Sequence, residues 1–286
     1  MLEVTAFFDE ATNNVSYVAA DNNTGKCAVF DSLLDYDAAS GRLTHESADL
    51  LIAYVEENNL EVEWIIDTHV HADHITGAHY IKRKTGGKTA IGSNITEVQK
   101  VFGKIFNENQ TFHTDGSQFD HLFEDNEEYH IGALTGRAIH TPGHTSACMV
   151  HHVADALFVG DTLFMPDFGT ARCDFPGGDV AKLYESIQKI YQFPDETRMF
   201  LCHDYKAPGR DEYAWETTVG EQKRSNVQAN QNITVEEFTE MRTARDEKLG
   251  TPRLMIPSVQ INMRAGDLPE PEANGASYIK VPLNIL

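Results

Sequence analysis

Three histidines and one aspartate lie within seven consecutive residues, in the segment THVHADH. The apolar run WII stands just before this segment and is typical of a buried β-strand. The end of a strand presents side chains rigidly, and residues two apart point the same way in extended backbone. His69 and His71 are therefore expected on one side, with Asp73 and His74 at the start of a following helix. Donors gathered in this way predict a metal site.

Three later residues carry further donors, each just beyond an expected strand. They are His144 in HTPGHTS, Asp161 in FVGDTLF and His203 in FLCHDY. A glycine precedes His144 and Asp161, and it allows the backbone to turn sharply and aim the next side chain inward. Imidazole and carboxylate donors together suit zinc, iron or manganese, so the donor types alone do not select the metal.

The rest of the chain alternates between strand-like and helix-like patterns. Strands are expected over residues 7–31, 62–67, 127–165 and 199–203. Helices are expected from about 47 to 58, from Asp73 or just after to about 84, over 95–107 and 180–191, and after Thr234. The N-terminal caps expected are a capping box at Asn94 and Glu97, Asp179, and a second capping box at Thr234 and Glu237.

Length and charge limit the classes of function. The chain of 286 residues shows no repeat or linker, which predicts one mixed α/β domain over residues 1–286 with a C-terminal extension from about 207. Its 44 acidic and 23 basic residues give a net charge of -21, which argues against nucleic acid or a membrane as partner. Four scattered cysteines and the absence of a signal-like start predict a cytoplasmic protein.

The order of the motifs carries a family resemblance. The motif H-x-H-x-D-H is followed by G-H-T, then G-D, then a late histidine, and this series resembles the metallo-β-lactamase fold superfamily. The resemblance implies an α/β fold of the metallo-β-lactamase-like type, a four-layer αββα sandwich. It also implies a metal centre at one edge, between the two sheets.

Two reaction classes compete within this superfamily. One is a thioester hydrolase of the glyoxalase II kind, in which two zinc ions activate a bridging hydroxide. Its donors would be divided as follows: His69, His71 and His144 on one ion, Asp73, His74 and His203 on the other, and Asp161 as the bridge. The other is a dioxygenase, in which two histidines and one carboxylate hold a single Fe(II) and leave positions open for O2 and substrate. A binding protein on an inactive fold is disfavoured because all the donor positions carry competent side chains.

Segments outside the donors favour the dioxygenase. GTARCDFPGGDVAKLYESI, FLCHDY and SVQINMRAG resemble the bacterial type of the persulfide dioxygenase (sulfur dioxygenase) branch. This resemblance implies one Fe(II) per chain, which zinc can replace, bound by His71, His144 and Asp161. The remaining donors would orient the ligands or hold water: His69, Asp73, His74 and His203. The implied reaction is the oxidation of glutathione persulfide, or a related thiol persulfide, by O2 to sulfite and free thiol.

A substrate of this kind carries carboxylates, so the acidic chain must offer a local positive group. The candidates for substrate binding are Arg172, Lys206 and Arg264, with Tyr205 as a neutral donor. Arg172 could equally pair with Asp174 and brace its loop. The expected partners are the small-molecule thiol persulfide and O2, and a homodimer is left open.

The adjacent residues His151 and His152 stand in an expected strand. Their side chains must point to opposite faces, so they are assigned to core packing or surface exposure rather than to the metal.

Overall fold

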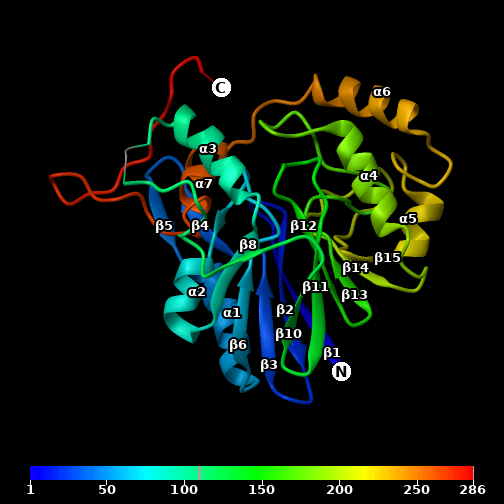
Figure 1. Cartoon of the computed structure of the whole chain (residues 1–286), viewed down its shortest axis with the longest axis horizontal. Coiled ribbons are helices and arrows are strands. Elements are labelled where there is room, and N and C mark those ends of the chain that lie inside the picture. The colour runs from blue at the N-terminus through cyan, green and yellow to red at the C-terminus, as the bar shows by residue number, and fades with distance from the viewer. Residues whose placement is uncertain (109–110, 286) are drawn as a thin grey trace.

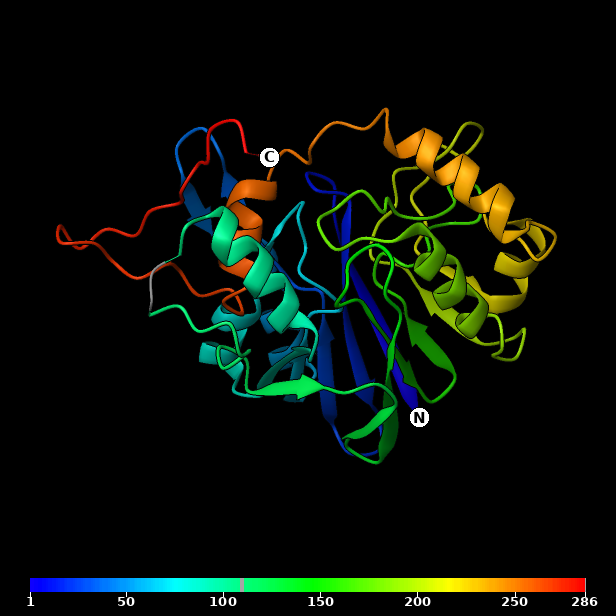
Figure 2. The same ribbon diagram turned by 45° about the horizontal axis from the view of Figure 1, so that its top comes forward.

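The computed structural model describes residues 1–108 and 111–285 and shows two facing β-sheets, each covered on its outer side by helices (Figure 1). The first sheet has the strand order β1-β2-β3-β6-β8-β9, the second runs in order from β10 to β15, and a small sheet has the order β5-β4-β7. In Figure 2, α1, α2, α3 and α7 lie on one side of the sheets and α4, α5 and α6 on the other. The layers form the αββα sandwich that was expected.

The strands have the following bounds. In the first sheet they are β1 (Leu2–Asp9), β2 (Asn14–Asp21), β3 (Lys26–Phe30), β6 (Glu61–Ile66), β8 (Lys88–Gly92) and β9 (His121–Phe123). In the second they are β10 (Glu127–Ile131), β11 (Leu134–His140), β12 (Met149–Val153), β13 (Ala156–Phe158), β14 (Arg198–Phe200) and β15 (Glu216–Thr218). In the small sheet they are β4 (Leu33–Asp37), β5 (Arg42–Thr44) and β7 (Ile75–Thr76).

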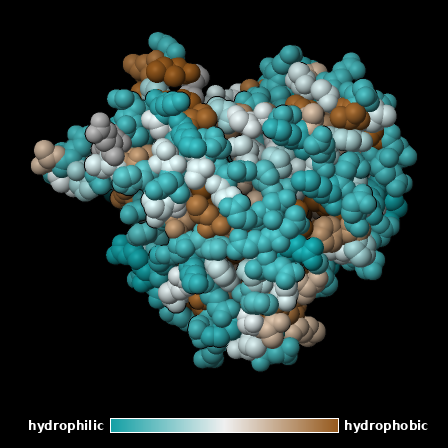
Figure 3. Space-filling model, viewed as in Figure 1, coloured by the Kyte–Doolittle hydropathy of each residue, from teal (hydrophilic) through white to brown (hydrophobic). Residues whose placement is uncertain are grey.

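The helices have the following bounds. They are α1 (Glu46–Glu57), α2 (Ala78–Thr85), α3 (Ile95–Ile105), α4 (Val180–Ile190), α5 (Val219–Ser225), α6 (Val235–Asp246) and α7 (Met255–Asn262). None of the helices in the described part of the chain combines the length and apolar composition needed to cross a membrane. The face seen in Figure 3 is mainly hydrophilic, in line with the net charge of -21.

Successive side chains along each strand point to opposite faces of its sheet, so they pack into different hydrophobic cores. In β2, Tyr17 packs with residues of the opposite sheet such as Phe158, whereas Val18 packs with the helix residue Leu51. The second sheet alternates in the same way, because Leu157 packs against α4 rather than against the first sheet. Both faces of each sheet are therefore apolar, which fixes the strand register and the edge where the donors meet.

Two of the three helix caps predicted from the sequence are present in the structure. Asp179 caps α4 by accepting a hydrogen bond from the Lys182 amide at 3.1 Å, and Thr234 forms the expected capping box of α6. The capping box expected at Asn94 is wrong. Its side chain makes no cap hydrogen bond, and its amide nitrogen lies 2.9 Å from His140 Nε2 instead.

The expected start of the second helix at Asp73 is also wrong, because α2 begins only at Ala78. The short strand β7 comes first and pairs with β4, with Ile75 opposite Leu34. The Thr76 amide, which helical backbone would use, donates instead to Asn262 Oδ1 at 2.8 Å. The donor-bearing segment is therefore an irregular loop and not the first turn of a helix.

Candidate metal centre

The ligand loop, residues 67–74, leaves the end of β6. Its three histidines, His69, His71 and His74, are fully buried, although their rings are polar. Buried irregular backbone needs hydrogen-bond partners from elsewhere in the chain. Two residues outside the loop provide them.

Asp31 holds the loop from the neighbouring strand, since it follows β3, which runs parallel to β6. Its Oδ1 accepts hydrogen bonds from the Thr68 amide at 2.7 Å and from His71 Nε2 at 3.0 Å. A carboxylate only accepts, so Nε2 of His71 carries the proton and Nδ1 is the atom left for a metal ion. Asp31 was not predicted from the sequence. It was recognisable there as an acidic residue directly after β3, the strand that pairs with β6.

Asn262, the last residue of α7, holds the loop from the opposite direction. Its amide nitrogen donates to the carbonyl oxygens of His71 at 2.9 Å and His74 at 2.8 Å, and its oxygen accepts from Thr76. Two of these hydrogen bonds fix the backbone of the ligand loop, and the third fixes β7 directly after it. In the sequence, the segment SVQINMRAG was considered only for its family resemblance and for Arg264. The role of Asn262 in positioning the ligand loop was therefore not predicted.

The first donor cluster comprises His69, His144 and Asp161, whose ligand atoms all lie within 4.8 Å of one another. Asp161 Oδ2 is 3.8 Å from His69 Nε2 and 3.6 Å from His144 Nε2. Two donors that are each about 2.1 Å from one ion lie roughly 3 to 4 Å apart. The spacing therefore suits ligands of a shared metal ion.

The backbone around the first cluster fixes the direction of its donors. His144 Nδ1 lies 2.7 Å from the carbonyl oxygen of Arg172, which can only accept, so the lone pair of Nε2 faces the cluster. The expected glycines take left-handed or extended positive-φ conformations, with φ of 148° at Gly143 and 51° at Gly160. A side chain at Gly160 would meet Thr68 Oγ1 at 2.5 Å, so the close approach to the ligand loop requires glycine.

The second donor cluster comprises His71, Asp73, His74 and His203. Asp73 accepts a hydrogen bond from His74 Nδ1 at 3.2 Å, and its other oxygen lies 3.0 Å from His203 Nε2. Asp161 Oδ1 lies 3.4 Å from His203 Nε2, which places Asp161 between the two clusters.

Three ring nitrogens of the second cluster lack a hydrogen-bond partner among the described residues. They are His71 Nδ1, His74 Nε2 and His203 Nε2, and all three are buried. A buried polar atom without a partner costs about 1–3 kcal/mol. Coordination to a metal ion would satisfy these atoms, so the donor set fits an ion on this structural observation as well as on its chemistry.

The protonation states of His69, His71 and Asp73 also suit metal binding. Burial lowers the pKa of His69 and His71 well below the ordinary value, so both rings are neutral near pH 7, the form that binds a metal. Burial alone would raise the pKa of Asp73, but His203 and His74 outweigh it and hold that pKa well below the ordinary value. Burial would likewise lower the pKa of His203, but Asp73 and Asp161 raise it.

The structure groups the predicted triad differently. The sequence analysis placed His71 with His144 and Asp161, whereas the structure places His69 there and His71 in the second cluster. The rings of His69 and His71 do lie side by side, 4.1 Å between centroids, as expected for residues two apart. The physical reason for the different grouping is the hydrogen bond from His71 Nε2 to Asp31, which leaves Nδ1 as the atom that meets the second cluster.

A cavity of about 260 Å³ opens onto the first cluster. Asp73, His144 and Asp161 line it, together with Tyr205 and Arg172 from the predicted substrate contacts. The ring of Tyr205 stacks on His203 at 5.6 Å between centroids, and the residue is 40% exposed. Tyr205 is therefore placed where a ligand of the centre would meet it.

Arg172 lines the same cavity, but its guanidinium is used within the protein. It donates to both oxygens of Asp174, at 2.5 and 2.6 Å, and to the carbonyl oxygen of Gly250 at 2.7 Å. Of the two roles considered for Arg172, the structure shows the bracing one.

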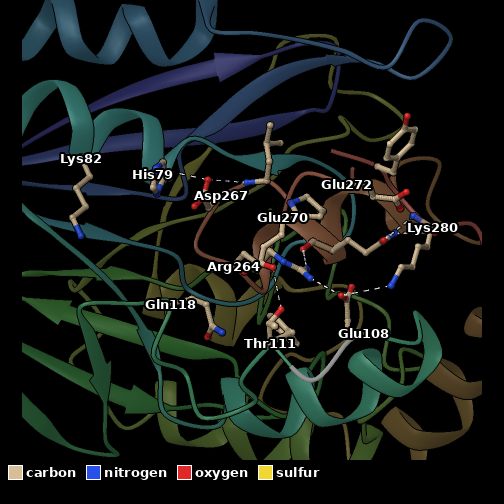
Figure 4. A pocket seen from close by; sticks show the side chains of 15 residues that line it. His79, Lys82, Glu108, Thr111, Gln118, Arg264, Asp267, Glu270, Glu272 and Lys280 are labelled. Carbon is tan, nitrogen blue, oxygen red and sulfur yellow. Dashed lines mark hydrogen bonds and ion pairs between the residues drawn. The ribbon is translucent and has the colours of Figure 1, made fainter. Parts of the chain in front are cut away.

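Lys206 and Arg264 do not line this cavity. Lys206 faces an adjacent one, with its ammonium 4.2 Å from the ring centre of Tyr213. Arg264 faces a separate cavity of about 370 Å³ beneath the C-terminal tail (Figure 4). There its guanidinium pairs with Glu108 at 2.7 Å and lies over the Phe112 ring at 4.3 Å. The prediction that Arg264 contacts a substrate at the metal centre is therefore wrong.

The chain is similar to proteins named as a hydrolase, a glyoxylase and a dioxygenase. A probable metallo-hydrolase of Burkholderia pseudomallei is 52% identical over 100% of both chains. Glyoxylase B2 of Dictyostelium discoideum is 49% identical over 100% of this chain and 97% of its own. The human persulfide dioxygenase ETHE1 is 24% identical over 91% of this chain and 87% of its own.

Structural comparison gives a relative of nearly the same extent. The crystal structure of ETHE1 from Myxococcus xanthus matches with a TM-score of 0.73 and 26% identity, and covers 93% of this chain and 100% of that one. A family model described as the metallo-beta-lactamase superfamily matches residues 9–203, which hold all the donors of both clusters. With this match, the αββα sandwich and the donors at its edge, the chain belongs to the metallo-beta-lactamase superfamily.

Proposed function

We propose that the chain is a non-haem iron persulfide dioxygenase that binds one Fe(II) through His69, His144 and Asp161. The reaction would convert glutathione persulfide, O2 and water into glutathione, sulfite and two protons. The observation that carries the proposal is the first donor cluster, since two histidines and one carboxylate facing an open cavity suit an iron centre that must admit both O2 and substrate.

The bound iron would supply the redox chemistry that lets O2 react with a persulfide sulfur. The chain's own residues would hold and orient the reactants. The cavity beside the first cluster admits the persulfide end, and the Tyr205 ring, stacked on His203, forms part of its wall. Asp31 and Asn262 keep the ligand loop in place, which preserves the direction of its donors.

The second donor cluster would support the iron ligands without taking an ion of its own. Asp73 already accepts a hydrogen bond from His74 Nδ1, and an ion bound at that oxygen would have to compete with it. The similarity over 93% of this chain to ETHE1 from Myxococcus xanthus also supports the assignment, because the human protein of that name is a persulfide dioxygenase.

The second candidate function is a zinc-dependent thioester hydrolase with two metal ions. The unpartnered nitrogens of His71 and His74 favour it, because a second ion would satisfy both. The Dictyostelium relative, Glyoxylase B2, is also much more similar in sequence than human ETHE1.

The metal content and the co-substrate separate the two functions. The chain should be purified without oxygen, analysed for metals, and tested in an oxygen electrode with glutathione persulfide. One iron per chain, with O2 uptake matched by sulfite, is the expected result. Two zinc ions per chain, with cleavage of S-lactoylglutathione in sealed oxygen-free vials and no O2 uptake, would overturn the proposal.

A matched control comes from reloading one batch of metal-free protein with either Fe(II) or zinc. Zinc can occupy iron sites during overproduction, so the metal found at first need not be the native one. Only the iron-loaded portion should consume O2. We further propose that the enzyme works in the cytoplasm, an inference supported by four cysteines that are free and buried.

A further inference from the structure

The mouth of the metal cavity carries an arginine that the sequence analysis did not select. Arg245, in the last turn of α6, lines the cavity that holds His144 and Asp161. It also lines the adjacent cavity that contains Lys206. Its guanidinium lies over the ring of Phe168, 5.3 Å from the centroid.

Arg245 differs from the other two arginines of this cavity in its partners. Arg172 is bound to Asp174, and Arg242 is buried and bound to Asp246 at 2.6 Å. The Arg245 side chain makes neither a hydrogen bond nor an ion pair with any residue in the described ranges, 1–108 and 111–285. Desolvation, followed by the neighbouring Arg242, lowers the pKa of Arg245, while Asp246 opposes this shift. The residue is exposed at the mouth of the cavity, where an added anion can reach its guanidinium.

The walls between the donors and Arg245 are largely apolar. They include Phe164, Phe168, Leu249 and Pro252. A ligand that fits must therefore have an uncharged end towards the metal donors and an anionic group towards the mouth. In a chain with a net charge of -21, an arginine without an acidic partner is a strong local signal for such an anion.

We propose that Arg245 binds a carboxylate of the carrier thiol and so selects carboxylate-bearing thiols of the glutathione type. The inference depends on one part of the proposed function, namely that the site binds a derivative of such a thiol. It holds equally for a persulfide dioxygenase and for a thioester hydrolase. Arg245 acts as a specificity-determining residue, remote from the reacting sulfur.

Lys206 is a weaker candidate for the same role. Its ammonium lies over Tyr213 in the adjacent cavity, which also contains the carboxylate of Asp211. It does not line the cavity with the metal donors. Arginine also presents two parallel donors to a carboxylate, whereas lysine presents a point charge.

The test measures binding of S-methylglutathione, which has both carboxylates but neither a persulfide nor a thioester, so it cannot turn over. Calorimetric titration of the metal-loaded full chain compares the wild type with Arg245→Gln. The variant should bind about tenfold more weakly, the effect of losing one charge-assisted hydrogen-bonded pair at a partly exposed site. Arg245→Lys should fall between the two.

The matched control is Lys248→Gln, which removes the same charge three residues further on from a side chain that does not line the cavity. It should bind the probe as the wild type does. Equally weakened binding of the probe in Arg245→Gln and Lys248→Gln would assign the effect to the overall electrostatic potential of the protein and overturn the proposal. Unchanged binding in Arg245→Gln, or no binding of the probe by the wild type, would also overturn it.

A second probe, the dimethyl ester of S-methylglutathione, removes the anionic groups. Wild type and Arg245→Gln should bind this ester equally, and a remaining tenfold difference would show that Arg245 acts through packing. Thermal unfolding midpoints identify a variant that has lost its fold, in which case Arg245→Lys supplies the comparison. Failure of O2 uptake with normal probe binding would sink the proposed dioxygenase while leaving this inference intact.

Discussion

The two donor clusters contain the same residue types but use their carboxylates differently. In the first, Asp161 stands 3.6 and 3.8 Å from the nitrogens of His144 and His69, a spacing that an ion between them would bridge. In the second, one oxygen of Asp73 accepts a hydrogen bond from His74 Nδ1 at 3.2 Å, while the other lies 3.0 Å from His203 Nε2. The hydrogen-bonded oxygen must give up His74 before it can bind an ion. Adjacent donors in one loop can therefore build a metal site and the network that supports it.

The largest expected effect is the difference between removing His69 and removing His71. His69→Ala should lose its iron and at least about a thousandfold of its O2 consumption, because two remaining donors no longer hold a redox-active ion. His71→Ala should keep one iron per chain and lose only about ten- to a hundredfold, the usual cost of removing a residue that orients a ligand. Metal analysis and oxygen-electrode rates on both variants check this.

The two variants serve as controls for each other, because both remove one buried imidazole from the same loop. If His71→Ala lost the iron and His69→Ala kept it, the triad expected from the sequence would be right and the grouping in the structure misleading. Loss of metal from both would favour a centre in which the two histidines share an ion.

The sequence predicted which residues form the centre better than how they are grouped. Strand ends can be recognised from local patterns, so the sequence singled out seven donors, and the structure brings these seven side chains together in the two clusters. Their grouping depends on Asp31, which turns the His71 ring from a position 40 residues earlier in the chain. The same holds for the helices. The cap at Asp179 is local and was predicted, whereas Asn94 turns to His140, which only the folded sheets bring near.

A smaller effect is expected from Asn262, which fixes the ligand loop shared by the two clusters. Asn262→Ala removes two hydrogen bonds to loop carbonyls and one from the Thr76 amide of β7, so iron should be held about ten- to a hundredfold more weakly. Titration with a competing Fe(II) chelator measures the affinity. Gln260→Ala is the matched control, since this buried amide of the same helix bonds Ile256 and the tail residue Lys280.

Both variants should lower the free energy of unfolding, because both delete buried hydrogen bonds. Only Asn262→Ala should change the iron affinity. Equal affinity in the two variants would mean that the loop keeps its shape without Asn262, and that the donors of both clusters are held from the strand side alone.

The smallest effect concerns a buried histidine that belongs to neither cluster. His151 points into the core beside Tyr129 and His152 is half-buried on the other face, as their adjacent places in a strand predicted. Burial lowers the pKa of His151 to about 3. The unfolded chain therefore binds a proton that the folded chain excludes, so the contribution to stability is full above about pH 6.5 and is lost as the pH falls towards 3.

Between pH 7 and pH 5 this single group should lower the free energy of unfolding by about 2 kcal/mol. His151→Leu should remove that part of the pH dependence, and urea unfolding of both proteins at the two pH values measures the difference. The cluster histidines titrate in both proteins, so their contribution cancels. If His151→Leu were as sensitive to acid as the wild type, His151 would be protonated in the folded protein without a loss of stability. Burial by itself would then not keep the imidazoles of this fold in the neutral form that binds a metal ion.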